Sequence, residues 1–239
     1  MKLNKNKIYP WRAKNSFELL INGVEFYPKM INAIDNAKNF ILLETYFVES
    51  GKISSQFITA VIAAVNRGVK VYVLFDDMGT RSLNESDRNL LVNNGVNLCF
   101  YHPIKFFAFL NNFYRDHRKL LLVDGSIAFI GGAGLSDQFI GDNYWRDNMI
   151  TIQGGVLQDW YALFLQNWQK QSEKPLPIQL PNEIINKQFN ALGRLSYTHG
   201  YFFNQIKIHL HQKIKTSKSK VWLVSAYFIP SLKLRRLLS

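Results

Sequence analysis

The stretch Asp116–Asp137, DHRKLLLVDGSIAFIGGAGLSD, decides how this chain folds. Two of its segments, Lys119–Val123 and Ser126–Ile130, are apolar and have the length of strands. They flank Asp124-Gly125, a dipeptide typical of tight turns between antiparallel strands. We therefore expect a β-hairpin here, and an antiparallel part in any larger sheet that contains it.

Just before the hairpin, a histidine lies close to a cation. Side chains two residues apart on a strand point to one face, so His117 and Lys119 can project together. Such a pair fits phosphodiester chemistry, because imidazole can attack phosphorus or transfer a proton while the ammonium group neutralises charge on the non-bridging oxygens. Asp124 is an odd number of positions from both, so we interpret it first as a turn residue. Gly131 and Gly132 let a neighbouring strand or a phosphate approach the backbone closely.

Around the hairpin, helical and strand-like segments alternate. Helical spacing of apolar residues covers Tyr27–Ala37, Ile53–Asn66, Glu85–Asn93 and Gly155–Lys170. Dense apolar runs of strand length cover Asn39–Val48, Val69–Phe75 and Val96–Tyr101. The alternation predicts an α/β fold, with a mixed β-sheet flanked by helices on both faces.

The end of the chain repeats an earlier pattern. Residues 37–50, AKNFILLETYFVES, align with residues 218–231, KSKVWLVSAYFIPS, at an offset of 181 residues. The proline-rich stretch 174–181 between them is typical of a linker. We expect one complete unit at 1–173, a linker region at 174–192 and the start of a second unit at 193–239. That second unit is cut short before any second H-x-K-x4-D pattern.

Basic residues gather in the same final part of the chain. The 239 residues include 29 Lys and Arg and 17 Asp and Glu, which gives a net charge of +12, and residues 184–239 hold 10 of the basic residues and no acidic one. This segment suits phosphate-bearing partners, either nucleic acid or an anionic membrane surface. The single cysteine, Cys99, excludes an internal disulfide. No apolar run reaches the roughly 18 residues of a membrane span.

The motif as a whole resembles a known family. His117-x-Lys119-x4-Asp124-x6-Gly131-Gly132 is similar to the signature of the phospholipase D superfamily. Its surroundings resemble bacterial cardiolipin synthases of the type without N-terminal membrane helices, through Trp11-Arg12, ILLETYF at 41–47, NRGVKVYVLFD at 66–76, WRD at 145–147 and SAYFIP at 225–230. The resemblance implies a phosphatidyltransferase that moves a phosphatidyl group between glycerophospholipids through a phosphohistidine, with no metal or other cofactor.

The resemblance also implies roles for single residues. His117 would be the nucleophile or its acid–base partner, Lys119 would bind phosphate, and Asp124 completes the catalytic signature. An acidic residue further along usually orients the histidine in this superfamily, and Asp147 is our candidate, with a structural or surface role as an equal alternative. The chain departs from the family at Gly134, where asparagine is usual.

The resemblance also implies partners, because each active site of the family pairs two such motifs. A homodimer or a separate chain would supply the second motif here. We expect the protein to act on phospholipids at the cytoplasmic face of the bacterial membrane, bound peripherally. The segment 102–115 could rest in a bilayer interface or form a core helix. Its expected membrane contacts are Phe106, Phe107, Phe109, Leu110 and Phe113.

Two other functions stay open at this point. One is a phosphodiesterase, nuclease or phospholipase D of the same superfamily, with nucleic acid as a partner in the nuclease case. The other is an inactive fragment that requires a partner chain. Among the remaining acidic residues, Glu44 and Glu49 end a predicted strand and are expected at the surface, while Asp76-Asp77 resembles a metal site only in isolation.

Overall fold

The computed structural model describes residues 7–103, 115–172, 175–180, 188–199, 203–225 and 227–238. The chain forms two compact units, one spanning Trp11–Arg194 and the other joining Met1–Pro10 with Leu195–Ser239. The division expected from the repeat, at 1–173, 174–192 and 193–239, stays a prediction, because compact packing does not by itself identify a repeated unit.

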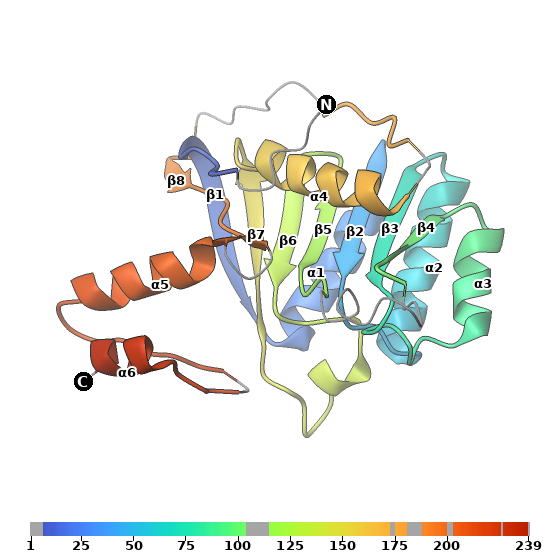
Figure 1. Ribbon diagram of the computed structural model, residues 1–239. Helices are drawn as coiled ribbons and strands as arrows, with labels where there is room; N and C mark the ends of the chain where they lie inside the picture. Colours follow the sequence, from blue (N-terminus) through green and yellow to red (C-terminus); the bar gives the residue numbers. More distant parts are fainter. Residues whose placement is uncertain are drawn as a thin grey trace. The chain divides into compact units, whose positions relative to one another are not determined.

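An eight-stranded mixed sheet lies at the centre of the larger unit (Figure 1). In sheet order its strands are β4 (Asn97–Tyr101), β3 (Lys70–Asp76), β2 (Phe40–Thr45), β5 (Lys119–Val123), β6 (Ile127–Gly131), β7 (Asn148–Gly154), β1 (Arg12–Ile21) and β8 (Ala191–Gly193). β2, β3 and β4 run parallel, and all other neighbours pair antiparallel. The predicted hairpin is confirmed as β5 and β6, and with it the mixed sheet.

Helices cover both faces of this sheet, as predicted. α1 (Gly23–Asp35), α2 (Lys52–Asn66) and α3 (Glu85–Asn93) lie on one face, and α4 (Leu157–Gln171) lies across the other (Figure 1). Alternate residues of β2 and β3 pack against the helices on the two faces. Leu43 joins the core around α2, whereas the ring of Tyr72 packs edge to face on Trp168 of α4, with centroids 5.2 Å apart. Strands buried on both faces read as continuous apolar runs, which explains the pattern in the sequence.

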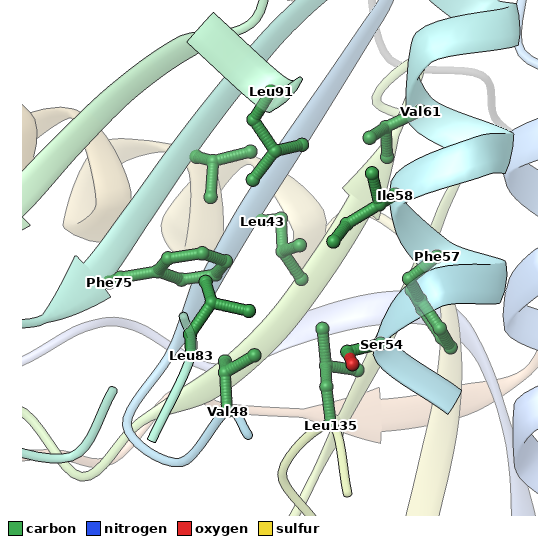
Figure 2. A pocket seen from close by; sticks show the side chains of 11 residues that line it. Leu43, Val48, Ser54, Phe57, Ile58, Val61, Phe75, Leu83, Leu91 and Leu135 are labelled. Carbon is green, nitrogen blue, oxygen red and sulfur yellow. The ribbon is translucent and has the colours of Figure 1, made fainter. Parts of the chain in front are cut away.

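Between α2 and the sheet the core leaves a small apolar cavity of about 10 Å³ (Figure 2). Figure 2 shows Phe57 and Ile58 of α2 facing Leu43 and Phe75 of the sheet across it. The hydroxyl of Ser54, which also lines it, donates to the backbone oxygen of Gly51 at 3.1 Å. The cavity is therefore a gap in core packing that presents no reactive group.

The sequence did not reveal three strands of the sheet, β1, β7 and β8. The β1 sequence shows no alternation of apolar and polar residues, since Phe17, Leu19 and Leu20 are all apolar although only Leu20 is buried. Tertiary contacts hold it instead: the Arg12 guanidinium forms a bidentate ion pair with the buried carboxylate of Asp159 on α4, at 2.6 and 2.8 Å. β1 is thus tied both to β7 and to the helical layer.

The smaller unit contains short elements: β9 (Thr198–His199), β10 (Phe203–Asn204), α5 (Gln205–Thr216) and α6 (Leu232–Leu238). The repeated stretch at 218–231 forms no strand in its described residues, and Trp222 and Val224 are 86% and 96% exposed. A strand needs a neighbouring strand for its backbone groups, and among the described residues of this unit β9 and β10 pair only with each other. Within the described ranges, no helix combines the length and apolar character needed to cross a membrane.

Asp124 fastens the hairpin turn to the start of β2. Its two carboxylate oxygens accept the backbone N–H groups of Lys38, Asn39 and Phe40, each at 2.8 Å. Its own N–H donates to the Phe40 carbonyl at 3.0 Å, and its φ of 52° lies in the left-handed region that aspartate tolerates. The side chain therefore fixes where β5 turns beside β2.

We predict that Asp124→Gly lowers the free energy of unfolding by about 1–3 kcal/mol, since three backbone donors lose their acceptor. Glycine adopts the same φ without strain, so the loss reports mainly on the carboxylate. Asp124→Asn, which keeps one acceptor oxygen, should lose less. Urea unfolding of the three proteins checks this, and equal midpoints for wild type and Asp124→Gly would contradict the clamping role.

Candidate active site

The sheet brings His117 and Lys119 together beside Tyr46. β5 runs antiparallel to β2 with Lys119 opposite Thr45, so the residues before β5 lie alongside those that follow β2. The His117 imidazole stacks on the Tyr46 ring, with centroids 4.0 Å apart and an interplanar angle of 18°. Lys119 Nζ donates to the His117 carbonyl at 2.8 Å and lies 5.5 Å from the centre of the Tyr46 ring. The predicted histidine–cation pair is thus a compact group at one end of the sheet.

The surroundings of His117 favour the neutral imidazole. Partial burial lowers the pKa of His117 below its ordinary value of 6.5, and the nearby charge of Lys119 lowers it further. The carboxylates of Asp76 and Asp116 oppose the shift without reversing it. At neutral pH the ring therefore mostly keeps a nitrogen lone pair, which attack on phosphorus or acceptance of a proton requires.

The other face of the same segment carries a buried polar cluster formed by Asp116, Arg118, Glu44 and Asn167. Arg118 Nε donates to Asp116 Oδ1 at 2.8 Å, and Arg118 Nη1 lies 3.7 Å from Glu44 Oε1. The side-chain amide of Asn167 on α4 donates to Glu44 at 2.7 Å and to Asp116 at 3.0 Å. Glu44 and Asp116 are only 1% and 5% exposed. The surface position expected for Glu44 is therefore wrong, because α4 covers this end of β2.

The two carboxyl groups of the buried polar cluster have pKa values shifted in opposite directions. Burial raises the pKa of Glu44 well above its ordinary value, while Arg118 and hydrogen bonds hold the pKa of Asp116 below its own despite burial. Among the described residues, no group donates a hydrogen bond to Glu44 Oε2. A proton on that oxygen turns it into a donor towards Asp116, and the pair then carries one negative charge against one arginine.

Asp147 lies against the glycine pair. A Cβ atom at Gly132 would overlap its carboxylate, and one at Gly131 would overlap the start of β7, so the closely approaching groups are a carboxylate and a strand. Asp147 is the strongest charge raising the pKa of Lys119, which burial lowers. The charges that shift the pKa of His117 are instead those of Lys119, Asp76 and Asp116. A direct role of Asp147 in orienting His117 stays a prediction.

The structure explains why position 134 of this chain is glycine, where the family usually has asparagine. A Cβ atom there would overlap the backbone oxygen of Phe47, and the Gly134 carbonyl accepts a hydrogen bond from the Tyr27 hydroxyl at 2.7 Å. Leu135 N donates to the same Phe47 oxygen at 2.8 Å, so the two segments run side by side. Close approach of two backbones leaves no room for a side chain at this position.

The remaining predicted site residues lie elsewhere. Asp124 is at the opposite end of β5 from Lys119, so the structure does not bring it to the His117 group. The expected membrane contacts, Phe106, Phe107, Phe109, Leu110 and Phe113, lie outside the described residues. Across the described ranges, no group of three or more His, Cys, Asp or Glu side chains is arranged to hold a metal ion. Asp76 takes part in hydrogen bonds to backbone N–H groups instead.

Comparison with known proteins identifies a matching family and curated relatives. Residues 30–168 match the family described as cardiolipin synthase, phospholipase D-like domain. A cardiolipin synthase from Oceanobacillus iheyensis is 30% identical over 97% of this chain and 49% of its own length. The chain spans about half the length of the curated relatives it matches.

Solved structures share the fold at low sequence identity. Nuc from Salmonella typhimurium, titled a phospholipase D family member, aligns with a TM-score of 0.52 and 17% identity, covering 67% of this chain and 99% of its own. The phosphatidylserine synthase of Haemophilus influenzae aligns with a TM-score of 0.54 and 19% identity, over 69% of this chain and 39% of its own. These likenesses establish the architecture of the larger unit.

The buried polar cluster predicts a contrast between two variants. Arg118→Met leaves Asp116 buried without its cation and should lower the free energy of unfolding by about 3–5 kcal/mol. Glu44→Gln keeps a donor towards Asp116 and should cost much less. Because the folded pKa of Glu44 is raised, its contribution to stability is present at low pH and is lost as pH rises through that pKa.

The stability of Glu44→Gln relative to wild type should therefore improve as the pH rises. Urea unfolding of wild type and both variants near pH 5 and near pH 8 tests both expectations. A fall in the relative stability of Glu44→Gln over that range would show that Glu44 is ionised in the native protein.

A second prediction concerns the pKa of His117. Lys119→Met removes a positive charge beside the imidazole, so the pKa of His117 should rise towards its ordinary value. An NMR titration of the histidine ring signals measures it directly. Lys29→Met, which removes an exposed lysine paired with Glu18, serves as the control and should leave His117 unchanged. A lower pKa of His117 in Lys119→Met would contradict the assigned electrostatics.

Proposed function

The chain belongs to the cardiolipin synthase family of phospholipase D-like domains, and we propose that it carries one half of a phosphatidyltransferase active site. The observation that supports this most directly is the His117–Lys119 pair at the end of the sheet, with a mostly neutral imidazole beside an ammonium group. The substrates in this proposal are glycerophospholipids, and the reaction transfers a phosphatidyl group from one to another.

In the proposed reaction, a ring nitrogen of His117 attacks the phosphorus of a phosphatidyl donor. A P–N bond forms, the P–O bond to the headgroup breaks, and the departing alcohol takes a proton from an acid partner. A hydroxyl group of a second lipid then attacks phosphorus, the P–N bond breaks, and the same partner recovers the proton. Lys119 stabilises the charge that builds on the non-bridging oxygens, and Asp147 favours the charged state of Lys119.

The acid partner in this scheme is a second motif histidine. The sequence holds a single H-x-K-x4-D pattern, at His117 to Asp124. A second copy of the chain or a separate polypeptide would supply the other. The working place is the cytoplasmic membrane surface, where the basic residues of 184–239 meet anionic lipid headgroups.

The same basic segment supports one alternative. Ten cations without a carboxylate between 184 and 239 would also bind the phosphates of nucleic acid, whatever the sequence. The His117–Lys119 pair would then act as part of a phosphodiesterase or nuclease. A further alternative is a chain that is inactive until a partner binds.

The test uses the full chain with vesicles of phosphatidylglycerol. We expect cardiolipin and glycerol in equal amounts, because each transfer joins two lipids and releases one glycerol. His117→Ala should abolish both products, and Lys119→Met should slow their formation by about 100-fold or more, as for loss of a group that stabilises transition-state charge. His211→Ala removes a histidine of the smaller unit and should keep the wild-type rate.

Three outcomes would overturn parts of this proposal. Undiminished products in His117→Ala would remove its assigned role. Plasmid cleavage that depends on His117, without any cardiolipin, would favour the nuclease. A protein that sediments as a monomer and forms neither product would exclude the homodimer and favour the fragment that needs a partner chain.

A further inference from the structure

Tyr46 lies directly against the reactive pair and has no assigned role. It follows the last residue of β2, and its ring is partly buried. One ring contacts both candidates: the His117 imidazole stacks on it at 4.0 Å, and Lys119 Nζ lies 5.5 Å from its centre. That distance is within the range in which an ammonium group is attracted to an aromatic face.

Stacking on Tyr46 does not cover the ring nitrogens of His117. The lone pair and the N–H bond of a neutral imidazole lie in the ring plane and point outwards from its edge. A stacked neighbour covers one face and leaves both nitrogens accessible. Stacking at an 18° interplanar angle therefore restricts rotation of the His117 ring without blocking attack on phosphorus.

A second segment, the turn that contains Gly79, lies close against Tyr46. A Cβ atom at Gly79 would lie 2.9 Å from ring carbon Cδ2 of Tyr46, and it would overlap the Tyr46 backbone oxygen. The absence of a side chain at Gly79 thus allows this turn to approach Tyr46 closely. This turn is fixed by Asp76, whose Oδ1 accepts the N–H groups of Met78 at 3.0 Å and Gly79 at 3.1 Å.

Asp76 also binds the backbone next to His117. Oδ2 of Asp76 accepts the N–H of Asp116, the residue before His117, at 2.9 Å. Asp76 is 1% exposed, and Arg115 Nη1 lies 3.5 Å from its Oδ1. One buried carboxylate therefore accepts hydrogen bonds both from the turn beside Tyr46 and from the residue before His117.

We propose that Tyr46 is a positioning residue, which holds the His117 imidazole by stacking in a frame anchored by Asp76. Its role in catalysis rests on the proposed phosphatidyl transfer, while the stacking itself can be observed without any activity. Restricted rotation matters because misplacement of a reacting group by about 1 Å can slow a reaction about 100-fold.

The experiment compares Tyr46→Leu with Tyr46→Phe by NMR of the full chain. Stacking on an aromatic ring moves the His117 ring-proton signals upfield, so Tyr46→Phe should keep their positions and Tyr46→Leu should move them downfield. Backbone amide signals of β2 and β5 report whether each variant is folded. A folded Tyr46→Leu protein with unmoved His117 ring signals would overturn the proposal.

A matched control lies in the same unit. Tyr101 stacks on His102 with centroids 4.3 Å apart and an angle of 11°. Tyr101→Leu should move the ring signals of His102 and leave those of His117 in place. A shift of the His117 signals as large as that in Tyr46→Leu would show that they respond to general loosening, and the positioning role would be rejected.

Where the wild-type chain forms cardiolipin, activity adds a second readout. Tyr46→Leu should lower kcat by about 100-fold with little change in KM, and Tyr46→Phe should restore most of the rate. If the wild type forms no product, the proposed function fails. The NMR comparison of Tyr46→Leu with Tyr46→Phe still tests whether Tyr46 stacks on His117. If Tyr46→Leu loses the stack but keeps the wild-type kcat, the positioning role fails while the proposed function stands.

Discussion

The alternation of side chains along Asp116–Lys119 is the constraint on which both the fold and the site depend. An extended backbone sends successive residues to opposite faces. His117 and Lys119 therefore meet Tyr46 on one face, while Asp116 and Arg118 enter the buried polar cluster with Glu44 and Asn167 on the other. A shift of one residue in the pairing of β5 with β2 would exchange the two sets and bury the reactive pair.

This arrangement places the buried charged groups and the His117–Lys119 pair on opposite faces of one segment. The buried charges are compensated within the cluster, since Arg118 faces both carboxyl groups, burial raises the pKa of Glu44, and Asn167 supplies two further hydrogen bonds. On the opposite face, the His117 side chain is exposed to solvent. Its pKa is lowered by partial burial and by the nearby charge of Lys119. Asp76 connects the surroundings of Tyr46 with those of His117. Its oxygens accept hydrogen bonds from the turn beside Tyr46 and from the backbone of the residue before His117.

Sequence patterns placed His117 and Lys119 side by side, as the structure has them, but misjudged some of their neighbours. Glu44 was expected at the surface, because a strand end gives no sign of the helix that covers it, yet Asn167 packs on it from 123 positions away. The sequence DHRK does hold a signal, since alternation that places His117 and Lys119 together must also place Asp116 with Arg118. The departure from the family at Gly134 also has a tertiary cause, because this residue lies where the backbone of Phe47 leaves no room for a side chain.

The sequence by itself determined the family, the hairpin, the parallel strands with their helices and the His117–Lys119 pair. Each of these rests on local periodicity or on a motif of fixed spacing, which a linear chain displays directly. The tertiary structure was needed to show the places of β1, β7 and β8, the burial of Glu44, the hydrogen bonds that Asp124 accepts at the start of β2, and the stacking of Tyr46 on His117. These depend on contacts between segments far apart in the chain, and burial, pKa and ring geometry follow from such contacts and not from local sequence.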